Sequence, residues 1–149
     1  MEFRKLLTVN NLIRAVAVIL SLVGGIMFLV TATSGYLKGN VYDVSVFVFA
    51  LLGALVVCGS AFLDLKFPKF GGFLLLVAGL FLSLALVNGI LDRVNFIGDS
   101  FIPMDYPEAF YSALNATYTS LILIGVSVIV VAVSCFIPEI ELLKEKVAE

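Results

Sequence analysis

Four long apolar stretches, separated by short polar segments, make up most of the 149-residue chain. A transmembrane helix needs about 20 consecutive, mostly apolar residues. Runs without Asp, Glu, Lys or Arg meet this requirement over residues 15–37, 44–63, 71–91 and 109–137. The pattern predicts an all-α integral membrane protein in which residues 1–149 form a single domain, an antiparallel bundle of four transmembrane helices.

The composition of the chain supports this prediction. Hydrophobic residues make up 62% of the sequence and charged residues 13%, against about 45–50% apolar and about 25% charged residues in soluble proteins. The net charge of −2 provides no basic surface for nucleic acid. We therefore expect the lipid bilayer as the first partner of the chain, and no nucleic-acid partner.

Basic residues predict the orientation of the spans, because short cytoplasmic segments carry an excess of Lys and Arg. The side with both termini and the 64–70 connection holds seven of the nine basic residues, and the other side holds Lys38 and Arg93. All five tyrosines lie near span ends on that second side, where amphipathic rings favour the membrane interface. Both termini are therefore predicted to be cytoplasmic, in a plasma membrane or bacterial inner membrane, with residues 138–149 as a short tail.

The first span has one alternative interpretation. Arg4 and Lys5, followed by an apolar run and the small residues Ala32, Thr33 and Ser34, are features of a cleaved signal peptide. The apolar core of a signal peptide is about 7–15 residues long, and this run is longer. We expect residues 15–37 to remain as a span.

Small residues recur at seven-residue intervals on the predicted spans. Helices in lipid associate by close packing and polar contacts, so small residues mark their interfaces. The candidate helix-packing or pore-lining positions are four residues on one face of the fourth span, here called the serine stripe, and one glycine each in the first and third spans: Ala113, Ser120, Ser127 and Ser134; Gly24; Gly79. A stripe of hydroxyls lines a helix interface in one interpretation and a pore in the other.

The segment between the third and fourth spans, residues 92–108, is predicted to be an extracytoplasmic loop that ends in a helix start. Asp105 is placed to cap the free amides, Pro107 suits the first turn, and Glu108 completes a capping box. The loop is too apolar for a freely solvated linker. Its side chains either cover the outer helix ends and headgroups or form a partner surface, whose candidate residues are Phe96, Phe101, Ile102, Met104, Asp105 and Tyr106.

The chain offers little of the chemistry that enzymes and coupled transporters use. It contains no histidine, which removes the commonest general base and metal ligand. No predicted span carries Asp, Glu, Lys or Arg in its middle, where coupled transporters commonly place one. Cys58 and Cys135 form no CxxC pair. We therefore predict no enzymatic activity, no catalytic or metal-binding residues and no cofactor.

The predicted role is therefore non-catalytic. We expect an interaction, accessory or scaffold subunit that contacts another membrane protein or a second copy of itself. One alternative is an oligomeric channel, or a small-solute or lipid transporter subunit, whose path is lined by Ser120, Ser127 and Ser134. Another is a lipid-binding protein with an apolar crevice beneath the outer loop. The surroundings of the serine stripe distinguish a subunit interface from a channel, because the stripe faces packed side chains in an interface and a water-filled path in a channel.

Overall fold

The described part of the chain is helical. A computed structural model describes residues 8–39 and 43–137. It contains four α-helices, α2 (Val9–Thr33), α3 (Ser45–Asp64), α4 (Pro68–Asp99) and α5 (Glu108–Phe136), and the short 3-10 helix η1 (Gly35–Leu37). No strand occurs within these described ranges. Each of the four α-helices is long and apolar enough to cross a membrane, which confirms the predicted all-α architecture with four helices of spanning length.

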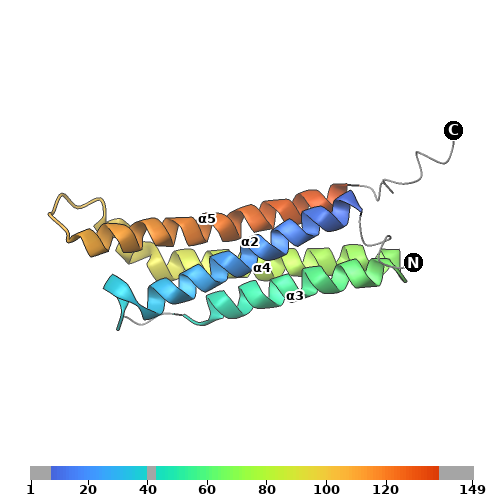
Figure 1. Ribbon diagram of the computed structural model, residues 1–149, viewed down its shortest axis with the longest axis horizontal. Coiled ribbons are helices and arrows are strands. Elements are labelled where there is room, and N and C mark those ends of the chain that lie inside the picture. The colour runs from blue at the N-terminus through green and yellow to red at the C-terminus, as the bar shows by residue number, and fades with distance from the viewer. Residues whose placement is uncertain (1–7, 40–42, 138–149) are drawn as a thin grey trace.

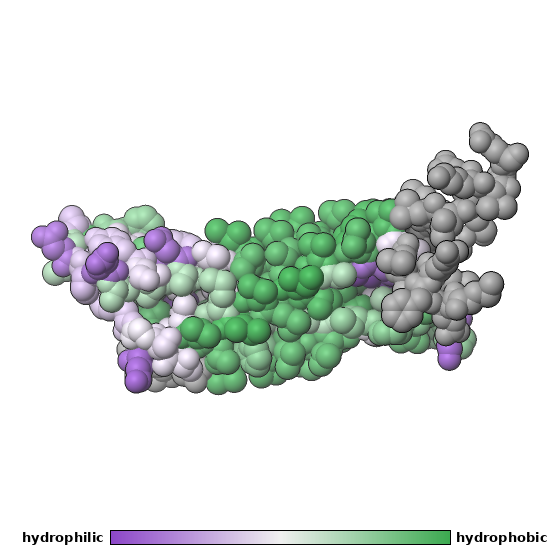
Figure 2. Space-filling model, viewed as in Figure 1, coloured by the Kyte–Doolittle hydropathy of each residue, from purple (hydrophilic) through white to green (hydrophobic). Residues whose placement is uncertain are grey.

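The four helices lie side by side and antiparallel (Figure 1). α3 packs most extensively on α4 and α2 on α5, while the α2–α3 and α4–α5 interfaces are smaller. We call the end where α2 begins and α5 finishes the terminal end, and the end where α4 connects to α5 the loop end (Figure 1). Hydrophobic residues cover the middle of the molecule, and hydrophilic residues gather at the loop end (Figure 2).

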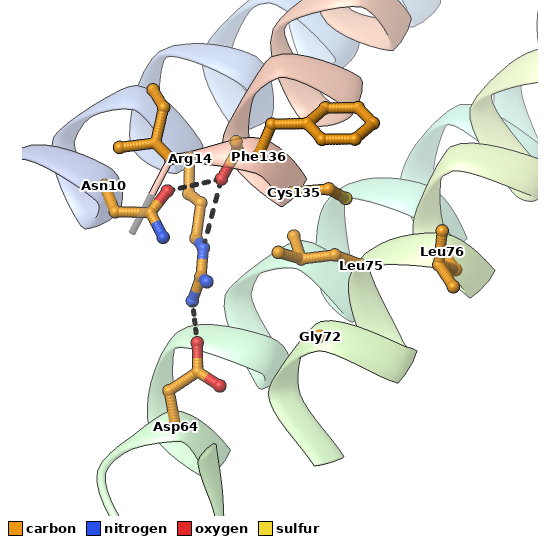
Figure 3. Close-up of a pocket in the computed structure, with 10 residues that line it drawn as sticks. Asn10, Arg14, Asp64, Gly72, Leu75, Leu76, Cys135 and Phe136 are labelled. Carbon is orange, nitrogen blue, oxygen red and sulfur yellow. Dashed lines mark hydrogen bonds and ion pairs between the residues drawn. The ribbon is translucent and has the colours of Figure 1, made fainter. Parts of the chain in front are cut away.

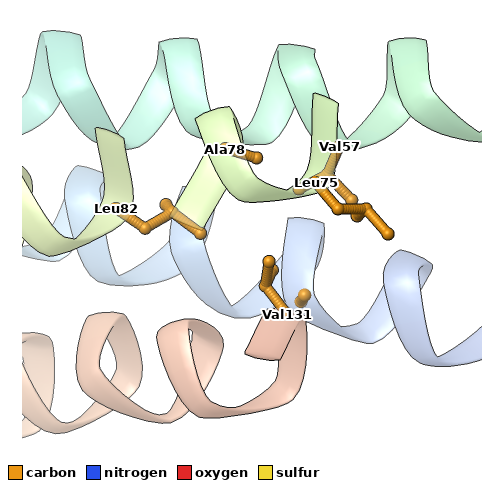
Figure 4. Close-up of a cluster of buried hydrophobic side chains, with 6 residues drawn as sticks. Val57, Leu75, Ala78, Leu82 and Val131 are labelled. Atoms are coloured by element: carbon orange, nitrogen blue, oxygen red, sulfur yellow. The ribbon is translucent and has the colours of Figure 1, made fainter. Parts of the chain in front are cut away.

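Three clusters of buried apolar side chains follow one another along the bundle. The cluster nearer the terminal end has members from all four helices (Figure 4): Ala17, Val57, Leu75, Ala78, Leu82 and Val131. The second, nearer the loop end, also draws on all four: Phe28, Val46, Ala50, Ala85, Leu121 and Ile124. A third closes the loop end: Leu37, Phe96 and Phe110. Small side chains alternate with large ones in the first two clusters, which lets the helices pack closely.

α4 continues past the predicted end of the third span. Its buried positions keep a three- and four-residue spacing beyond the first charged residue: Leu82, Ala85, Gly89, Arg93 and Phe96. The predicted 92–108 loop is therefore wrong over residues 92–99, which form the last turns of α4. The physical reason is that charge ends an apolar span, whereas a helix continues as long as one of its faces can pack.

α2 begins earlier than the predicted first span. Thr8 is its N-cap residue, and the Thr8 side chain accepts a hydrogen bond from the backbone N–H of Asn11 at 3.3 Å. The helix therefore includes Arg14, which is only 4% exposed. The predicted span begins after Arg14 because its limits are set at charged residues, and an unpaired charge is costly to bury. In the structure Arg14 is paired.

The start of α5 differs from the predicted capping box. Pro107 is the N-cap residue, and the helix begins at Glu108 without a side-chain cap. The prediction that Asp105 caps this helix is wrong, because Pro107 has extended backbone angles, φ −63° and ψ 154°, and the helix begins only after it. Asp105 is exposed, two residues before the cap position.

Helices α2 and α5 approach each other closely at Gly24. A Cβ atom at this position would lie 2.8 Å from Cγ1 of Ile124 and 3.0 Å from the backbone oxygen of Ser120. The first contact is shorter than real Cβ contacts, so the Ile124 side chain would have to move, and the second is so tight that the backbone of α5 would have to give slightly. The missing side chain therefore lets the two backbones come together, as in other small-residue helix interfaces.

We predict that Gly24→Ala destabilises the bundle by about 1–3 kcal/mol, because the added methyl group overpacks the α2–α5 interface. Gly59→Ala is the matched control, since a Cβ atom there meets no atom within 4 Å. The measurement is reversible unfolding of the purified protein in mixed detergent micelles. Equal stability of the two variants would contradict close packing at Gly24.

Candidate functional site

A buried polar cluster lies at the terminal end of the bundle. α2, α3 and α5 contribute its members, here called the Arg14 cluster: Asn10, Arg14, Asp64 and Ser134. Asn10 and Arg14 are each 4% exposed and Ser134 is 1% exposed, while the Asp64 side chain is 7% exposed. Polar groups are costly to bury unless they are hydrogen-bonded, so the contacts among these residues decide the stability of the cluster.

Arg14 is the centre of this network (Figure 3). Its Nη1 atom forms an ion pair with Oδ2 of Asp64, and its Nε atom donates to Oγ of Ser134 at 3.4 Å. The Ser134 hydroxyl donates in turn to Oδ1 of Asn10 at 2.6 Å. The network joins α2 to both α3 and α5 and gives the buried guanidinium an opposite charge.

α4 reaches the cluster through its backbone at Gly71. A Cβ atom on Gly71 would overlap Oδ1 of Asp64, so the carboxylate occupies the place of a side chain. Gly71 lies in the first turn of α4, and the N-terminal end of a helix carries partial positive charge. The Asp64 carboxylate therefore lies between two positive groups, the Arg14 guanidinium and the N-terminal end of α4.

A pocket of about 540 Å³ opens beside the Arg14 cluster (Figure 3). Its apolar wall comes from α4 and the end of α5: Gly72, Leu75, Leu76, Cys135, Phe136 and Ile137. A second hollow of about 370 Å³ between α4 and α5 shares Leu75, Leu76 and Cys135 with it. Gly79 lines this second hollow, where a Cβ atom would lie 3.9 Å from Cγ1 of Val131. The two hollows adjoin at these shared residues, and together we call them the depression, which has polar walls at the terminal end and apolar walls along α4 and α5.

An aromatic cap, formed by Tyr36, Phe96, Tyr106 and Phe110, closes the loop end. The Phe110 ring stacks on that of Tyr106 with centroids 4.1 Å apart. It meets the rings of Phe96 and Tyr36 edge-on, at 5.0 and 5.3 Å. The Tyr106 hydroxyl donates to the backbone oxygen of Asp99 at 3.1 Å. Partial burial and the charge of Asp99 raise the pKa of Tyr106, so the phenol stays protonated and can donate this bond at neutral pH.

Arg93, which the charge pattern assigned to the outer loop, is a second buried arginine. It lies on α4, is 3% exposed, and places its guanidinium carbon 4.7 Å from the ring centroid of Phe28. Its Nε atom is 3.9 Å from Oδ2 of Asp92. Among the described residues, Nε and Nη2 of Arg93 have no hydrogen-bond partner. The sequence signal for its inward position is that Arg93 continues the three- and four-residue spacing of apolar and small residues along α4.

A polar link joins α3 to α4 near the loop end. The Asn88 amide donates to Oγ of Ser45 at 3.2 Å, and the backbone N–H of Ser45 donates to Oδ1 of Asp43 at 2.8 Å. Hydrogen bonds from the side chain and the backbone of Ser45 lower the pKa of Asp43. The Asp43 carboxylate therefore stays ionised at neutral pH and holds the start of α3.

The serine stripe lies on the inward face of α5. Ser120, Ser127 and Ser134 are at most 1% exposed, and Ala113 is half-buried. The hydroxyls of Ser120 and Ser127 donate to carbonyl oxygens three residues earlier in α5, at 2.8 and 2.6 Å. Gly24 of α2 faces the stretch of α5 that contains Ser120. These contacts pack the stripe between helices, and Ser134 alone of the four joins the Arg14 cluster.

The candidate residues of the outer loop are separated in the structure. Phe96 is buried in the aromatic cap and Tyr106 is half-buried there. The other four are exposed at the connection between α4 and α5: Phe101, Ile102, Met104 and Asp105. The loop therefore divides into residues that cover the helix ends and residues that face outward.

Comparison of the chain with protein-family models, curated proteins and solved structures finds no match. The four apolar helices are compatible with a small multi-pass membrane protein. Within the described ranges, no three His, Cys, Asp or Glu side chains are grouped so that they could hold a metal ion. The four apolar helices therefore define the class of protein, and its polar groups and surfaces carry the information about its role.

We predict that Asp64→Asn destabilises the protein by about 3–5 kcal/mol, because Arg14 then stays buried without a charged partner. Asp105→Asn removes an exposed carboxylate and should change stability by less than about 0.5 kcal/mol. Unfolding in mixed micelles compares the two variants.

Replacing both members of the pair, in Arg14→Leu with Asp64→Leu, should recover most of the loss, because no uncompensated charge remains. A double variant that is less stable than Asp64→Asn would argue against the ion pair as the cause.

Proposed function

We propose that the chain is a small, non-catalytic, multi-pass membrane protein that acts as an interaction or accessory subunit. In this proposal the bundle anchors the protein in a plasma membrane or bacterial inner membrane. The loop end contacts another membrane protein outside the bilayer. Two features support it: the packed interior of the bundle and the exposed apolar residues at the loop end.

The observation that carries the proposal is the exposure of apolar side chains in the α4–α5 connection. Phe101 is 80% exposed, Met104 63% and Ile102 49%. The α4–α5 connection that carries them lies at the loop end, beyond the apolar middle of the molecule (Figures 1 and 2). Exposed apolar side chains in water are costly when they gather, and such groups commonly mark interaction sites.

The connection is held in place although its side chains face outward. Backbone N–H groups of Phe101, Ile102 and Met104 donate to carbonyl oxygens two or three residues earlier, at 3.1, 3.0 and 2.8 Å. Tyr106 ties the end of the connection to Asp99. A surface that is ordered before binding loses less entropy on association, which favours a docking role for these residues over a solvated linker.

The packing of the serine stripe gives less support to a channel through one bundle. Ser120 and Ser127 are buried and their hydroxyls are satisfied within α5. A conducting path needs polar groups that face water. A transport role therefore requires a path between several copies of the chain, and no described feature favours that over partner binding.

We expect that Phe101→Ser combined with Met104→Ser reduces recovery of a stoichiometric partner at least tenfold, because the apolar contact is lost. The tagged protein is purified from its native membrane in mild detergent and co-purifying proteins are identified by mass spectrometry. Val44→Ser is the matched control, since Val44 is 49% exposed just before α3 at the same end of the bundle. A partner retained equally by both variants, or the recovery of a homo-oligomer alone, would contradict the proposal.

The proposed orientation makes a separate prediction. Ser100→Cys should react with a membrane-impermeant maleimide added to intact cells, and Lys66→Cys should react only after lysis, because the basic residues place Lys66 inside. Cys58 and Cys135 are replaced by alanine in both proteins, since both thiols are exposed on the bundle. Labelling of Lys66→Cys in intact cells would reverse the orientation.

A further inference from the structure

We propose that the depression between α4 and α5 binds one acidic phospholipid, with an acyl chain along the two helices and the headgroup beside the Arg14 cluster. This inference is independent of the proposed docking role of the loop end. It rests on the shape of the depression, its polarity along the bundle and the charges around its polar end.

The apolar part of the depression has the volume of a small-molecule site. Its volume, about 370 Å³, lies within the range of about 300–1,000 Å³ that is usual for small-molecule sites, whereas a helix with its side chains is about 10–12 Å across. Gly79 and Ser83 leave the α4 wall hollow, opposite Val128 and Ala132 of α5. The hollow therefore fits an acyl chain better than a partner helix.

The depression opens onto the apolar surface of the bundle. Leu76 and Leu80, which line it, are 61% and 66% exposed. From Gly72 to Ser83 it follows α4 for about 16 Å at 1.5 Å per residue. This is about half of the roughly 30 Å hydrocarbon thickness, so the groove has the length of one leaflet and is entered from the lipid side.

The polar end of the depression lies where a headgroup would be. Its wall contains Asn10, Arg14, Asp64 and Ser134, and all four are at least nine-tenths buried at their side chains. The guanidinium and amide N–H groups can donate to a phosphate, and the carboxylate and hydroxyl oxygens can accept from a glycerol hydroxyl.

The charges at this end favour an acidic headgroup. Lys66 is exposed in the α3–α4 connection. Among the residues that the structure describes at this end, the positive charges of Arg14 and Lys66 outnumber the single carboxylate of Asp64. The predicted orientation places this end in the cytoplasmic leaflet, which carries the acidic lipids.

The test is native mass spectrometry of the purified full chain in detergent, titrated with phosphatidylglycerol or with phosphatidylcholine. We expect one tightly retained phosphatidylglycerol and at least tenfold weaker retention of phosphatidylcholine. Gly79→Leu should lower phosphatidylglycerol retention at least tenfold, because the new side chain occupies the groove, where the nearest atom to an added Cβ atom is Cγ1 of Val131 at 3.9 Å. Gly59→Leu, on α3 and facing open space, should bind as the wild type does.

Ser83→Leu fills the same hollow from one turn further along α4 and serves where Gly79→Leu fails to fold, as judged by size-exclusion chromatography. Equal retention of lipid by the groove variants and Gly59→Leu would overturn the proposal, since it would show annular lipid only. Equal affinity for the two lipids would overturn the acidic headgroup. Lipid binding that appears only after deletion of residues 138–149 would identify the tail of the chain as the occupant instead. The loop-end variants leave this assay unchanged, so it fails or succeeds independently of the partner experiment.

Discussion

Close approach of helix backbones is the constraint on which the rest of this structure depends. Lipid chains are as apolar as leucine side chains, so helices gain little by burying apolar surface against each other and associate by dispersion contacts and hydrogen bonds. Gly24 leaves the room that α5 needs. On the facing side of α5, the hydroxyls of Ser120 and Ser127 donate hydrogen bonds to backbone carbonyl oxygens of the same helix. The interface is therefore close, and neither of these two serine hydroxyls is left unpaired in it.

The two buried arginines show two ways of placing a charge in such a bundle. Arg14 pairs with the Asp64 carboxylate of α3 and donates to a hydroxyl of α5. Arg93 lies over the ring of Phe28, and its Nε atom is 3.9 Å from the Asp92 carboxylate. Both lie towards helix ends, where the cost of a charge is lower than at the middle of a span. These polar contacts are thus concentrated at the helix ends, and the middle of the bundle relies on packing.

The helix interfaces around the bundle differ in size, and a hollow lies at one of the smaller ones. α3 on α4 and α2 on α5 form the larger interfaces, and α4 on α5 forms a smaller one. The small residues Gly79 and Ser83 lie on this smaller interface and leave volume that the chain does not fill. The resulting hollow is near the terminal end, whereas the exposed connection between α4 and α5 is at the loop end. The proposed lipid site and the proposed partner surface therefore occupy separate parts of the molecule.

The sequence by itself determined the number of helices, because the length of an apolar run is a local property that needs no knowledge of neighbours. The heptad spacing of Ser120, Ser127 and Ser134 likewise indicated one shared face. Only the tertiary structure decided that Arg14 pairs with Asp64, 50 residues away, that Gly71 makes room for this carboxylate, and that α4 continues through Arg93. These features depend on which helices are adjacent and how each is rotated about its axis. That choice is made by the summed packing of all four helices, which no single stretch of sequence contains.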